Sequence, residues 1–456
     1  MKHGLITPER LALSTDLYEL TMAAAYFAGG AAGRTATFDL NIRQLPPERG
    51  FLVVAGLEQA LAYLRDLRFT PEALAYLARS GHFRSDFLDY LSELRFSGSI
   101  DAMPEGTVAF PPAPLLRATA PIIEAQIVET YLLTTLTFQT MIASKAARIV
   151  GAADRRQVVD FSPRRDHGPQ AGLLAARAAY IGGCVGTSNV LAGERFGLTT
   201  YGTMAHSFIM FHASEEEAFA AFARSYPGDP TLLIDTYDTM AGARMAVRAA
   251  SALAAKGRKL AAVRLDSGDL VVLSRKVRAI LDEAGLQDTK IFASGGLDEH
   301  EIHRLLAAGA EVDAFGVGTE LGTSGDAPSL DSTYKLVAYA DAAGEEKPVI
   351  KLSTGKTTLP GRKQVWRLGD GSGRFARDTI GLVGERLEGE PLLLPAMRDG
   401  QPLGDPPALD ALQQRAAKQL AATPEEVRRL RDPVPYPVEC SAALAALLDS
   451  LRQRGA

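Results

Sequence analysis

Residues 260–296 read LAAVRLDSGDLVVLSRKVRAILDEAGLQDTKIFASGG, and the architecture of the chain follows from this stretch. An apolar run at 260–266 fits a buried strand, and residues 270–284 then carry apolar side chains at helical spacing. A second strand-like run follows at 290–294. The alternation extends on both sides, with strand-like runs that begin at residues 231, 260, 290 and 312. Strands separated by helices indicate βα units and a parallel sheet.

A closed or irregular α/β barrel fits this rhythm better than an open doubly wound sheet. No Gly-x-Gly-x-x-Gly turn opens a helix after the first strand, as a dinucleotide-binding sheet requires. Ser214 with Glu217 forms a capping box, which marks the start of a helix. The expected strands are 199–203, 231–236, 260–266, 290–294 and 312–317, and the expected helices are 170–181, 215–224, 241–255, 270–284 and 299–308.

The flanking regions have a different texture, which predicts a second α+β domain built from the N-terminal module and returning C-terminal strands. Before the barrel we expect helices 16–28, 57–67 and 129–149 and strands 36–42, 106–110, 115–119 and 122–128. After it we expect strands 347–352 and 364–368, a loop over 389–407, and helices 408–420 and 424–432. The predicted domains are 1–135, 136–340 and 341–456, the last packing back on the first.

Composition excludes several classes of protein. The 456 residues carry a formal net charge of −5, so nothing draws the chain toward nucleic acid or an anionic membrane. Cys184 and Cys440 are too few for a disulfide framework. The first 20 residues lack a signal-peptide pattern, and no run of about 18 apolar residues occurs. We expect a soluble cytoplasmic protein with no membrane partner.

Polar, charged or glycine clusters follow five successive strands of the predicted barrel. Barrel enzymes build their sites at these strand ends, so the clusters predict an active site. They lie at residues 202–207, 235–237, 264–269, 294–296 and 316–319.

The residue types in these clusters suit anionic substrates. The glycine-rich ends, which include Ser294, Gly295, Gly318 and Thr319, present backbone N–H groups to a phosphate, although tight turns alone would also explain them. Arg264 at a buried strand end needs an anionic partner, and the paired arginines at 164–165 suit phosphates.

Three aspartates are candidate Mg²⁺ ligands. Asp266 and Asp269, with Asp235, fit a metal ion that bridges a polyphosphate. For Asp269, capping of the following helix is an equally good interpretation.

One of the seven histidines stands out. His206 lies at a strand end between small residues, whereas His300 and His303 are one residue short of zinc-protease spacing. We therefore expect a chemical role for His206.

The motifs together resemble nicotinate phosphoribosyltransferase. They are residues 13–22, 161–168, 186–193, 202–207, 263–270 and 315–319, and the similarity covers about residues 10–370. The resemblance implies a homodimer with active sites shared between subunits. It implies attack of nicotinate on phosphoribosyl pyrophosphate (PRPP), which yields nicotinate mononucleotide and pyrophosphate for NAD salvage. It also implies ATP as a co-substrate, whose hydrolysis is coupled through a phosphohistidine.

Roles for individual residues follow from the same resemblance. His206 matches the phosphorylated histidine, and Tyr18 and Phe161 match the aromatic pair around the nicotinate ring, with Tyr18 donated by the partner subunit. Thr203 and Arg264 match nicotinate contacts, and Thr319 matches a PRPP phosphate contact. Arg164 and Asp266 match contacts to pyrophosphate and to ribose or Mg²⁺. Ser188 stands where nicotinamide-specific relatives carry an aspartate, which implies a preference for nicotinate.

Two alternatives from other classes are weaker. A phosphate-recognising aldolase would need a lysine at a barrel strand end, and the five clusters contain none. A non-catalytic regulatory relative would be expected to have lost His206 or Arg264, and both are present.

Overall fold

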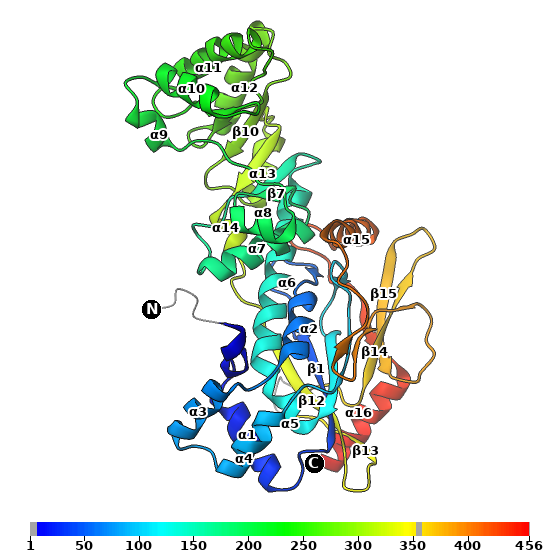
Figure 1. Cartoon of the computed structure of the whole chain (residues 1–456). Helices are drawn as coiled ribbons and strands as arrows, with labels where there is room; N and C mark the ends of the chain where they lie inside the picture. Colours follow the sequence, from blue (N-terminus) through cyan, green and yellow to red (C-terminus); the bar gives the residue numbers. More distant parts are fainter. Residues whose placement is uncertain (1–6, 353–357, 456) are drawn as a thin grey trace. The chain divides into compact units, whose positions relative to one another are not determined.

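The computed structural model describes residues 7–352 and 358–455. The chain divides into two compact units (Figure 1). The α+β unit combines Met1–Met141 with Ser329–Ala456, and the barrel unit is Ile142–Pro328. The predicted return of C-terminal strands to the N-terminal module is therefore confirmed.

A parallel sheet forms the centre of the barrel unit. Its strands pair in the order β7 (Gly186–Thr187), β6 (Gln157–Asp160), β11 (Ala314–Val317), β10 (Lys290–Ser294), β9 (Ala262–Leu265) and β8 (Thr231–Leu233). The strand interiors supply the core, since Val263, Leu265, Ile291 and Phe315 are fully buried. Burial of apolar side chains on a parallel sheet covered by helices is the main favourable term for such a unit.

The sheet closes irregularly between β7 and β8. Thr200 forms an isolated parallel bridge with Thr187, and the Oγ1 of Thr203 then donates a 2.6 Å hydrogen bond to the carbonyl of Thr231 in β8. The predicted strand 199–203 was therefore too long, because Thr203 bonds through its side chain rather than through a backbone ladder. The predicted irregular α/β barrel is confirmed.

Helices cover the sheet and begin directly after the strand ends. They are α7 (Pro169–Ile181), α8 (Val190–Phe196), α9 (His206–Phe211), α10 (Glu215–Ser225), α11 (Thr239–Ala254), α12 (Leu270–Glu283), α13 (Glu299–Ala307) and α14 (Thr319–Gly322). The side chains of Asp238, Asp269 and Asp298 accept first-turn backbone N–H groups, as does Ser214. An N-cap side chain bonds first-turn backbone N–H groups that have no partner within the helix. Part of the polar side chains at the strand ends therefore serves to cap helices. Figure 1 shows α10, α11 and α12 side by side.

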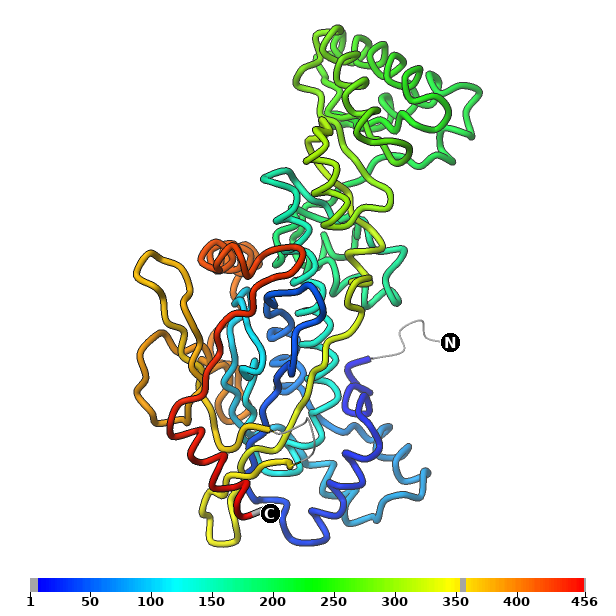
Figure 2. Tube along the Cα trace, turned by 180° about the vertical axis from the view of Figure 1, so that it is seen from behind, coloured from blue at the N-terminus to red at the C-terminus, as the bar shows by residue number. Residues whose placement is uncertain are grey.

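The sheets of the α+β unit combine strands from the N-terminal and C-terminal parts of the chain. Its larger sheet runs β13 (Glu346–Pro348), β12 (Ser332–Ala340), β1 (Thr35–Ile42), β5 (Pro114–Pro121), β3 (Ser99–Ala102), β17 (Leu394–Arg398) and β18 (Gln401–Pro402). A second sheet runs β16 (Glu390–Pro391), β14 (Lys363–Gly369), β15 (Phe375–Leu382) and β19 (Val438–Cys440), and β2 (Leu52–Val53) pairs with β4 (Val108–Ala109). In Figure 2 the orange and red C-terminal segments run beside blue and cyan N-terminal ones.

Helices complete this unit. They are the 3₁₀ segment η1 (Pro8–Leu13), α1 (Leu17–Ala28), α2 (Leu57–Asp66), α3 (Pro71–Ser80), α4 (Ser85–Glu93), α5 (Ile122–Ile127), α15 (Leu409–Ala422) and α16 (Ala442–Gly455). The long helix α6 (Glu129–Ala152) contributes residues to both units.

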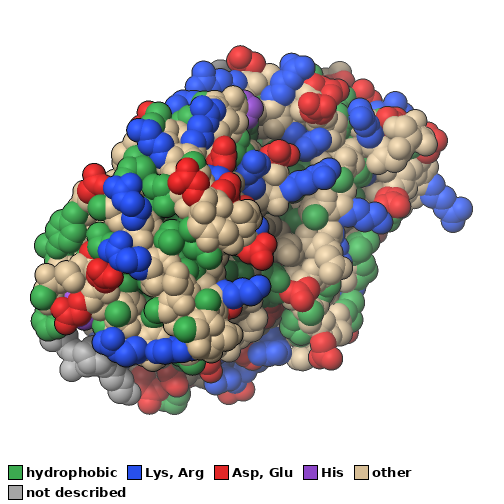
Figure 3. Space-filling view, turned by 90° about the horizontal axis from the view of Figure 1, so that it is seen from above, with side chains coloured by type: hydrophobic (Ala, Val, Ile, Leu, Met, Phe, Trp, Pro, Cys, Tyr) green, Lys and Arg blue, Asp and Glu red, His purple; other side chains and the backbone are tan. Residues whose placement is uncertain are grey.

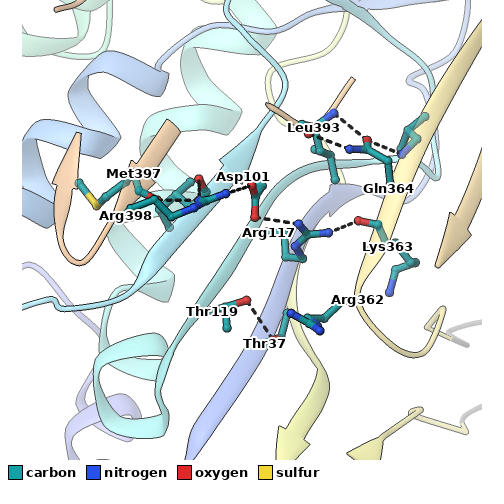
Figure 4. A network of polar contacts seen from close by, with 12 residues as sticks. Thr37, Asp101, Arg117, Thr119, Arg362, Lys363, Gln364, Leu393, Met397 and Arg398 are labelled. Atoms are coloured by element: carbon teal, nitrogen blue, oxygen red, sulfur yellow. Dashed lines mark hydrogen bonds and ion pairs between the residues drawn. The ribbon is translucent and has the colours of Figure 1, made fainter. Parts of the chain in front are cut away.

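Ion pairs tie the C-terminal strands to the N-terminal sheet, as Figure 4 shows. Arg117 of β5 pairs with Asp101 of β3 at 2.7 Å and also donates to the carbonyl of Lys363 in β14. Arg398 of β17 holds the other oxygen of Asp101 at 2.6 Å. These bonds join β3, β5, β14 and β17, so segments nearly 300 residues apart in sequence share one partly buried network.

The expected loop over 389–407 instead contains strands β16, β17 and β18, and β17 pairs with β3. Two predicted helices or strands of this unit were also wrong. Residues 122–128 form α5 rather than a strand, and every residue of α5 is buried, so the apolar run carries no period by which to tell helix from strand. Residues 424–432 form turns rather than a helix. The carbonyl of Val427 lies so close to Gly50 that a Cβ there would be 1.9 Å away, and Asp432 adopts a φ of 47°. Tertiary packing decides both cases.

The surface is mixed in charge. Lys and Arg side chains lie among Asp and Glu side chains across the face shown in Figure 3. Within the described residues, no helix is long and apolar enough to cross a membrane.

Candidate active site

Neighbouring strand ends bring the predicted site residues of the barrel unit into contact. Since β9 and β10 are parallel and adjacent, Arg264 of β9 reaches the end of β10. Its Nε donates to the Oγ of Ser294 at 2.8 Å, and its Nη2 donates to Asp266 Oδ1 at 2.6 Å. The predicted association of these three residues is therefore observed.

Aromatic side chains lie against this arginine. The guanidinium carbon of Arg264 is 5.4 Å from the centre of the Phe161 ring, within range of a cation–π interaction. The Phe161 ring centre in turn lies 5.4 Å from that of Phe292. Close packing also explains Gly316, where a Cβ would lie 2.6 Å from the Phe161 ring. An apolar wall and a cationic group thus stand next to each other.

Asp266 is held in its charged form. Burial on its own would raise the pKa of this carboxyl, but the hydrogen bond from Ser294 and the charge of Arg264 outweigh burial and lower the pKa. Its backbone N–H donates to Asp235 Oδ2 at 2.8 Å, and the hydroxyl of Ser267 donates to the same oxygen at 2.7 Å. The other oxygen of Asp235, Oδ1, is buried and has no hydrogen-bond partner among the described residues. A buried, unpaired carboxylate oxygen is costly, which makes it a candidate ligand for a cation.

His206 faces the second oxygen of Asp266. Its Nε2 lies 3.8 Å from Asp266 Oδ2, and its Nδ1 lies 3.1 Å from the hydroxyl of Thr236. The side chain is 40% exposed, so a reactant can approach the ring. Thr236 had no predicted role, although it belongs to one of the five strand-end clusters.

The glycine-rich ends present backbone rather than side chains. Gly295 has a φ of 88°, and a Cβ there would lie 2.1 Å from the carbonyl oxygen of Asp266. The loop after β10 therefore packs directly on the loop after β9. Gly318 lies against the backbone of Phe161, and Thr319 begins α14 with an exposed side chain. Both observations fit close approach of a ligand to backbone N–H groups.

Arg164 lies in an exposed turn that also carries the half-buried Asp166 and follows the buried Asp160. Asp160, at the end of β6, accepts from the Thr187 hydroxyl and from the backbone of Ser162, and burial raises its pKa. Asp166 accepts from the Ser162 hydroxyl, and burial together with the charge of Asp160 raises its pKa to about 6. These bonds fix the fold of the turn that carries Arg164.

Asp269 is accounted for by capping. Its Oδ1 accepts the backbone N–H groups of Val271 and Val272 at 3.1 and 3.2 Å. The structure therefore shows the N-cap interpretation directly. Thr203, by contrast, contributes to closure of the barrel through its bond to Thr231.

Tyr18 belongs to the α+β unit and lies in the first turn of α1, 46% exposed. Burial and the charge of Glu129 raise its pKa. The neighbouring Glu19 is fully buried, and its carboxylate accepts hydrogen bonds from the hydroxyls of Thr15 and Thr130. Burial raises the pKa of Glu19 to about 7 despite those two bonds.

Comparison with known proteins agrees with the fold. The model of the nicotinate phosphoribosyltransferase N-terminal domain matches residues 13–137, and that of the C-terminal domain of the same enzyme matches 385–448. The tail, which the sequence motifs left unassigned, thus belongs to the same family. Residues 142–331 match the quinolinate phosphoribosyl transferase C-terminal domain.

Individual proteins are similar over nearly the whole chain. A Mycobacterium tuberculosis protein named nicotinate phosphoribosyltransferase pncB2 is 48% identical over 443 residues, covering 97% of this chain and 94% of its own. The crystal structure of human nicotinic acid phosphoribosyltransferase superimposes with a TM-score of 0.86 at 30% identity, covering 96% of this chain and 99% of that one. A nicotinate-nucleotide pyrophosphorylase from Pyrococcus furiosus superimposes with a TM-score of 0.75 at 29% identity, covering 92% and 99%. This chain belongs to the nicotinate phosphoribosyltransferase family of enzymes.

Proposed function

We propose that the chain transfers the phosphoribosyl group of PRPP to nicotinate and couples this transfer to ATP hydrolysis through a phosphohistidine at His206. Nicotinate mononucleotide and pyrophosphate are the products. The observation that carries the proposal is the juxtaposition of Arg264, the Phe161 ring and the His206–Asp266 pair at one end of the barrel.

Arg264 suits the carboxylate of nicotinate. A guanidinium has five N–H donors, and the bonds to Ser294 and Asp266 engage two of them. The remaining donors are available to a substrate carboxylate, and the Phe161 ring beside them offers a face for the pyridine ring. Binding in this pose would hold the ring nitrogen toward PRPP, which is the geometry that attack on the anomeric carbon needs.

Ser188 supports a preference for nicotinate over nicotinamide. It carries no charge and lies half-buried after β7, so it does not oppose a negative substrate. A site built on a charge-assisted arginine–carboxylate pair disfavours the neutral amide by about 1.5–3 kcal/mol, roughly tenfold to a hundredfold.

The pyrophosphate end of PRPP suits the two glycine-rich strand ends. Backbone N–H groups near Gly295 and at the Gly318–Thr319 turn can receive phosphate oxygens, and the exposed Arg164 adds a positive charge. Negative charge grows on the leaving pyrophosphate, so donors fixed in advance stabilise the transition state more than the ground state.

Mg²⁺ fits the carboxylates present. Asp235 offers a buried oxygen without a partner, and Asp266 is held ionised, so these two would hold the ion, together with substrate oxygens. Asp269 was the other expected ligand, but its cap engages one of its oxygens. When bound, the ion would neutralise charge on the leaving pyrophosphate.

His206 is suited to accept a phosphoryl group. Thr236 contacts Nδ1 and so orients the ring, and Asp266 faces Nε2. The carboxylate would stabilise the imidazolium that forms on phosphoryl transfer, as in other histidine–carboxylate pairs.

We further propose a homodimer with shared sites, in which Tyr18 of one subunit covers the nicotinate ring bound by the other. Tyr18 and its neighbour Leu17 are both exposed, and adjacent exposed apolar side chains suit a surface that a second subunit covers.

The test is an assay of pyrophosphate release from PRPP with nicotinate, nicotinamide or quinolinate as the base, each with and without ATP. We expect release with nicotinate, stimulation by ATP, and ATP hydrolysis that depends on both substrates. Equal catalytic efficiency on nicotinamide would contradict the assignment of the base. Quinolinate turnover with release of CO₂ would favour the reaction named for the family that matches residues 142–331.

The variant Ser188→Asp sharpens the assignment of the base. Its added carboxylate should repel nicotinate and lower kcat/KM for that base by about tenfold, with little effect on the KM for PRPP. Ser188→Asn adds similar volume without charge and is the matched control.

A further inference from the structure

A buried cluster of charged side chains in the barrel unit includes none of the strand-end residues described above. Lys145 and Arg148 of α6 meet Glu299, the first residue of α13, and Asp326. The side chains of Lys145, Arg148 and Glu299 are at most 1% exposed. Burying charged side chains costs desolvation free energy, so buried charges are found closely paired with opposite charges.

Lys145 is the residue that joins the two carboxylates. Its ammonium nitrogen lies 2.5 Å from Glu299 and 2.9 Å from Asp326. Arg148 holds the other oxygen of Glu299 at 2.8 Å. Lys145 and Arg148 lower the pKa of Glu299 in spite of its burial, so the carboxylate stays charged.

Each carboxylate stands just beyond one of the two glycine-rich strand ends. Glu299 opens α13 after the short loop that starts with Ser294 and Gly295. Asp326 lies in the turn that follows α14, whose first residue is Thr319. That turn is fixed to α14, because the backbone of Gly325 donates to Glu320 and that of Ser324 to Leu321.

Helix α14 also contacts the turn of Arg164. At Gly322 a Cβ would lie 1.8 Å from an oxygen of Asp166 and 2.4 Å from the Cβ of Ser162. A shift of α14 would therefore displace the arginine turn as well as Thr319.

We propose that Lys145 is a positioning residue for PRPP: its ammonium group sets the spacing of the two glycine-rich loops so that both receive the same pyrophosphate. This rests on the proposed function of those loops. Lys145 is buried, so it acts on the two loops through Glu299 and Asp326 and does not touch the substrate itself. Its removal would leave Asp326 without this cation and loosen both loops, and small misplacements of binding groups are costly.

Lys145→Met tests this proposal, with two measurements on each variant: steady-state kinetics and calorimetric titration with inorganic pyrophosphate. We expect the KM for PRPP to rise by about tenfold and pyrophosphate affinity to fall by a similar factor, while the KM for nicotinate changes less than about twofold. Lys145→Arg keeps the charge and should restore most of the lost affinity.

The matched control is Lys363→Met in the α+β unit, which removes another buried lysine, paired with Asp39 at 2.8 Å. It should lower thermal stability without raising the KM for PRPP. If Lys145→Met does not fold, Asp326→Asn, which spares the Lys145–Glu299 pair, should show the same selective effect on a smaller scale.

An unchanged pyrophosphate affinity in the folded variants, or an equal rise of both KM values, would overturn the proposal. Failure of the wild-type protein to use PRPP and nicotinate would instead refute the proposed function. The pyrophosphate titration separates these two failures, since it needs no turnover.

Discussion

Each unit contains a cluster of arginine and aspartate side chains, and the two clusters have different roles. In the α+β unit, Arg117 and Arg398 hold both oxygens of Asp101, and a backbone carbonyl completes the set (Figure 4). In the barrel unit, Arg264 holds only one oxygen of Asp266, and the other faces His206 at 3.8 Å. Asp235 beside it keeps one oxygen without a partner among the described residues.

The difference shows how to tell a structural network from a reactive one. Both aspartates have lowered pKa values, for the same reason: arginine and hydrogen-bond partners outweigh burial. Ionisation therefore does not separate them. What separates them is the number of hydrogen-bonding groups that a ligand could still engage. In the first network, both oxygens of the aspartate are already bonded to arginines. The second keeps an acceptor oxygen, an accessible imidazole and guanidinium donors.

Removal of His206 should give the largest functional effect. His206→Ala takes away the group that faces the second oxygen of Asp266, so ATP hydrolysis and ATP stimulation should fall by about 10³-fold or more. Slow ATP-independent transfer should persist, because Arg264 and the phosphate loops stay intact. Coupled ATPase and pyrophosphate assays measure both activities.

The control is His303→Ala, which removes an exposed histidine of α13. It should behave as the wild-type protein. Full ATP coupling in His206→Ala would show that another residue receives the phosphoryl group.

The same substitution in the two clusters tests the comparison directly. Arg264→Gln should lower kcat/KM for nicotinate by about a hundredfold, because the substrate carboxylate loses its cation. Arg117→Gln should leave kcat/KM nearly unchanged but destabilise the α+β unit by about 1.5–3 kcal/mol, since it removes one of the two arginines that hold the largely buried Asp101. Kinetics and urea unfolding of both variants give the answer. Comparable kinetic losses would mean that the distinction between the clusters is wrong.

Subunit mixing tests whether Tyr18 completes a neighbouring site. Tyr18→Ala and Arg264→Ala proteins should each be nearly inactive. After random exchange, half of the dimers would be mixed, with one intact site in two, so about a quarter of wild-type activity should return. Exchange is verified by mass-tagged subunits, and the absence of recovery after proven exchange would place each site within one chain.

The smallest predicted effect concerns pH. The folded pKa of Glu19, about 7, lies above its unfolded value, so the folded state binds this proton more tightly. That stabilisation is complete below about pH 4.5 and is lost as the pH rises through 7, at about 1–3 kcal/mol in total. Glu19→Gln should lack this loss, and urea unfolding from pH 4.5 to 7.5 compares the two proteins. Parallel curves would mean that Glu19 is ionised throughout.

Much of the barrel could be predicted because its signals are local. Strands such as 290–294 carry an apolar run at their centre, and an N-cap such as Asp298 stands immediately before its helix. The cluster of Arg264, Asp266 and Ser294 followed from the rule that parallel strands end at the same edge.

The rest depends on contacts between distant residues. Strand β15 was missed because Asp378 interrupts its apolar pattern, and that aspartate is buried only because Arg367 pairs with it at 2.7 Å. Thr236 was not predicted to contact His206, since a threonine after a strand carries no signal of its own. Lys145 lies within an apolar helix about 150 residues before Glu299, so nothing nearby in sequence reveals its partner.

The closure of the barrel at Thr203 is a seam that side-chain hydrogen bonds, rather than a continuous backbone ladder, hold together. Elsewhere in the ring, successive strands are joined by backbone ladders, which no side-chain substitution removes. At the seam, the described residues are joined by the bridge at Thr200, the hydroxyl bond to Thr231 and the His206–Thr236 hydrogen bond. Backbone amides on either side of the seam should therefore exchange with solvent deuterium sooner than those of β9 and β10, and binding of substrates that bear on residues 203–206 should slow that exchange.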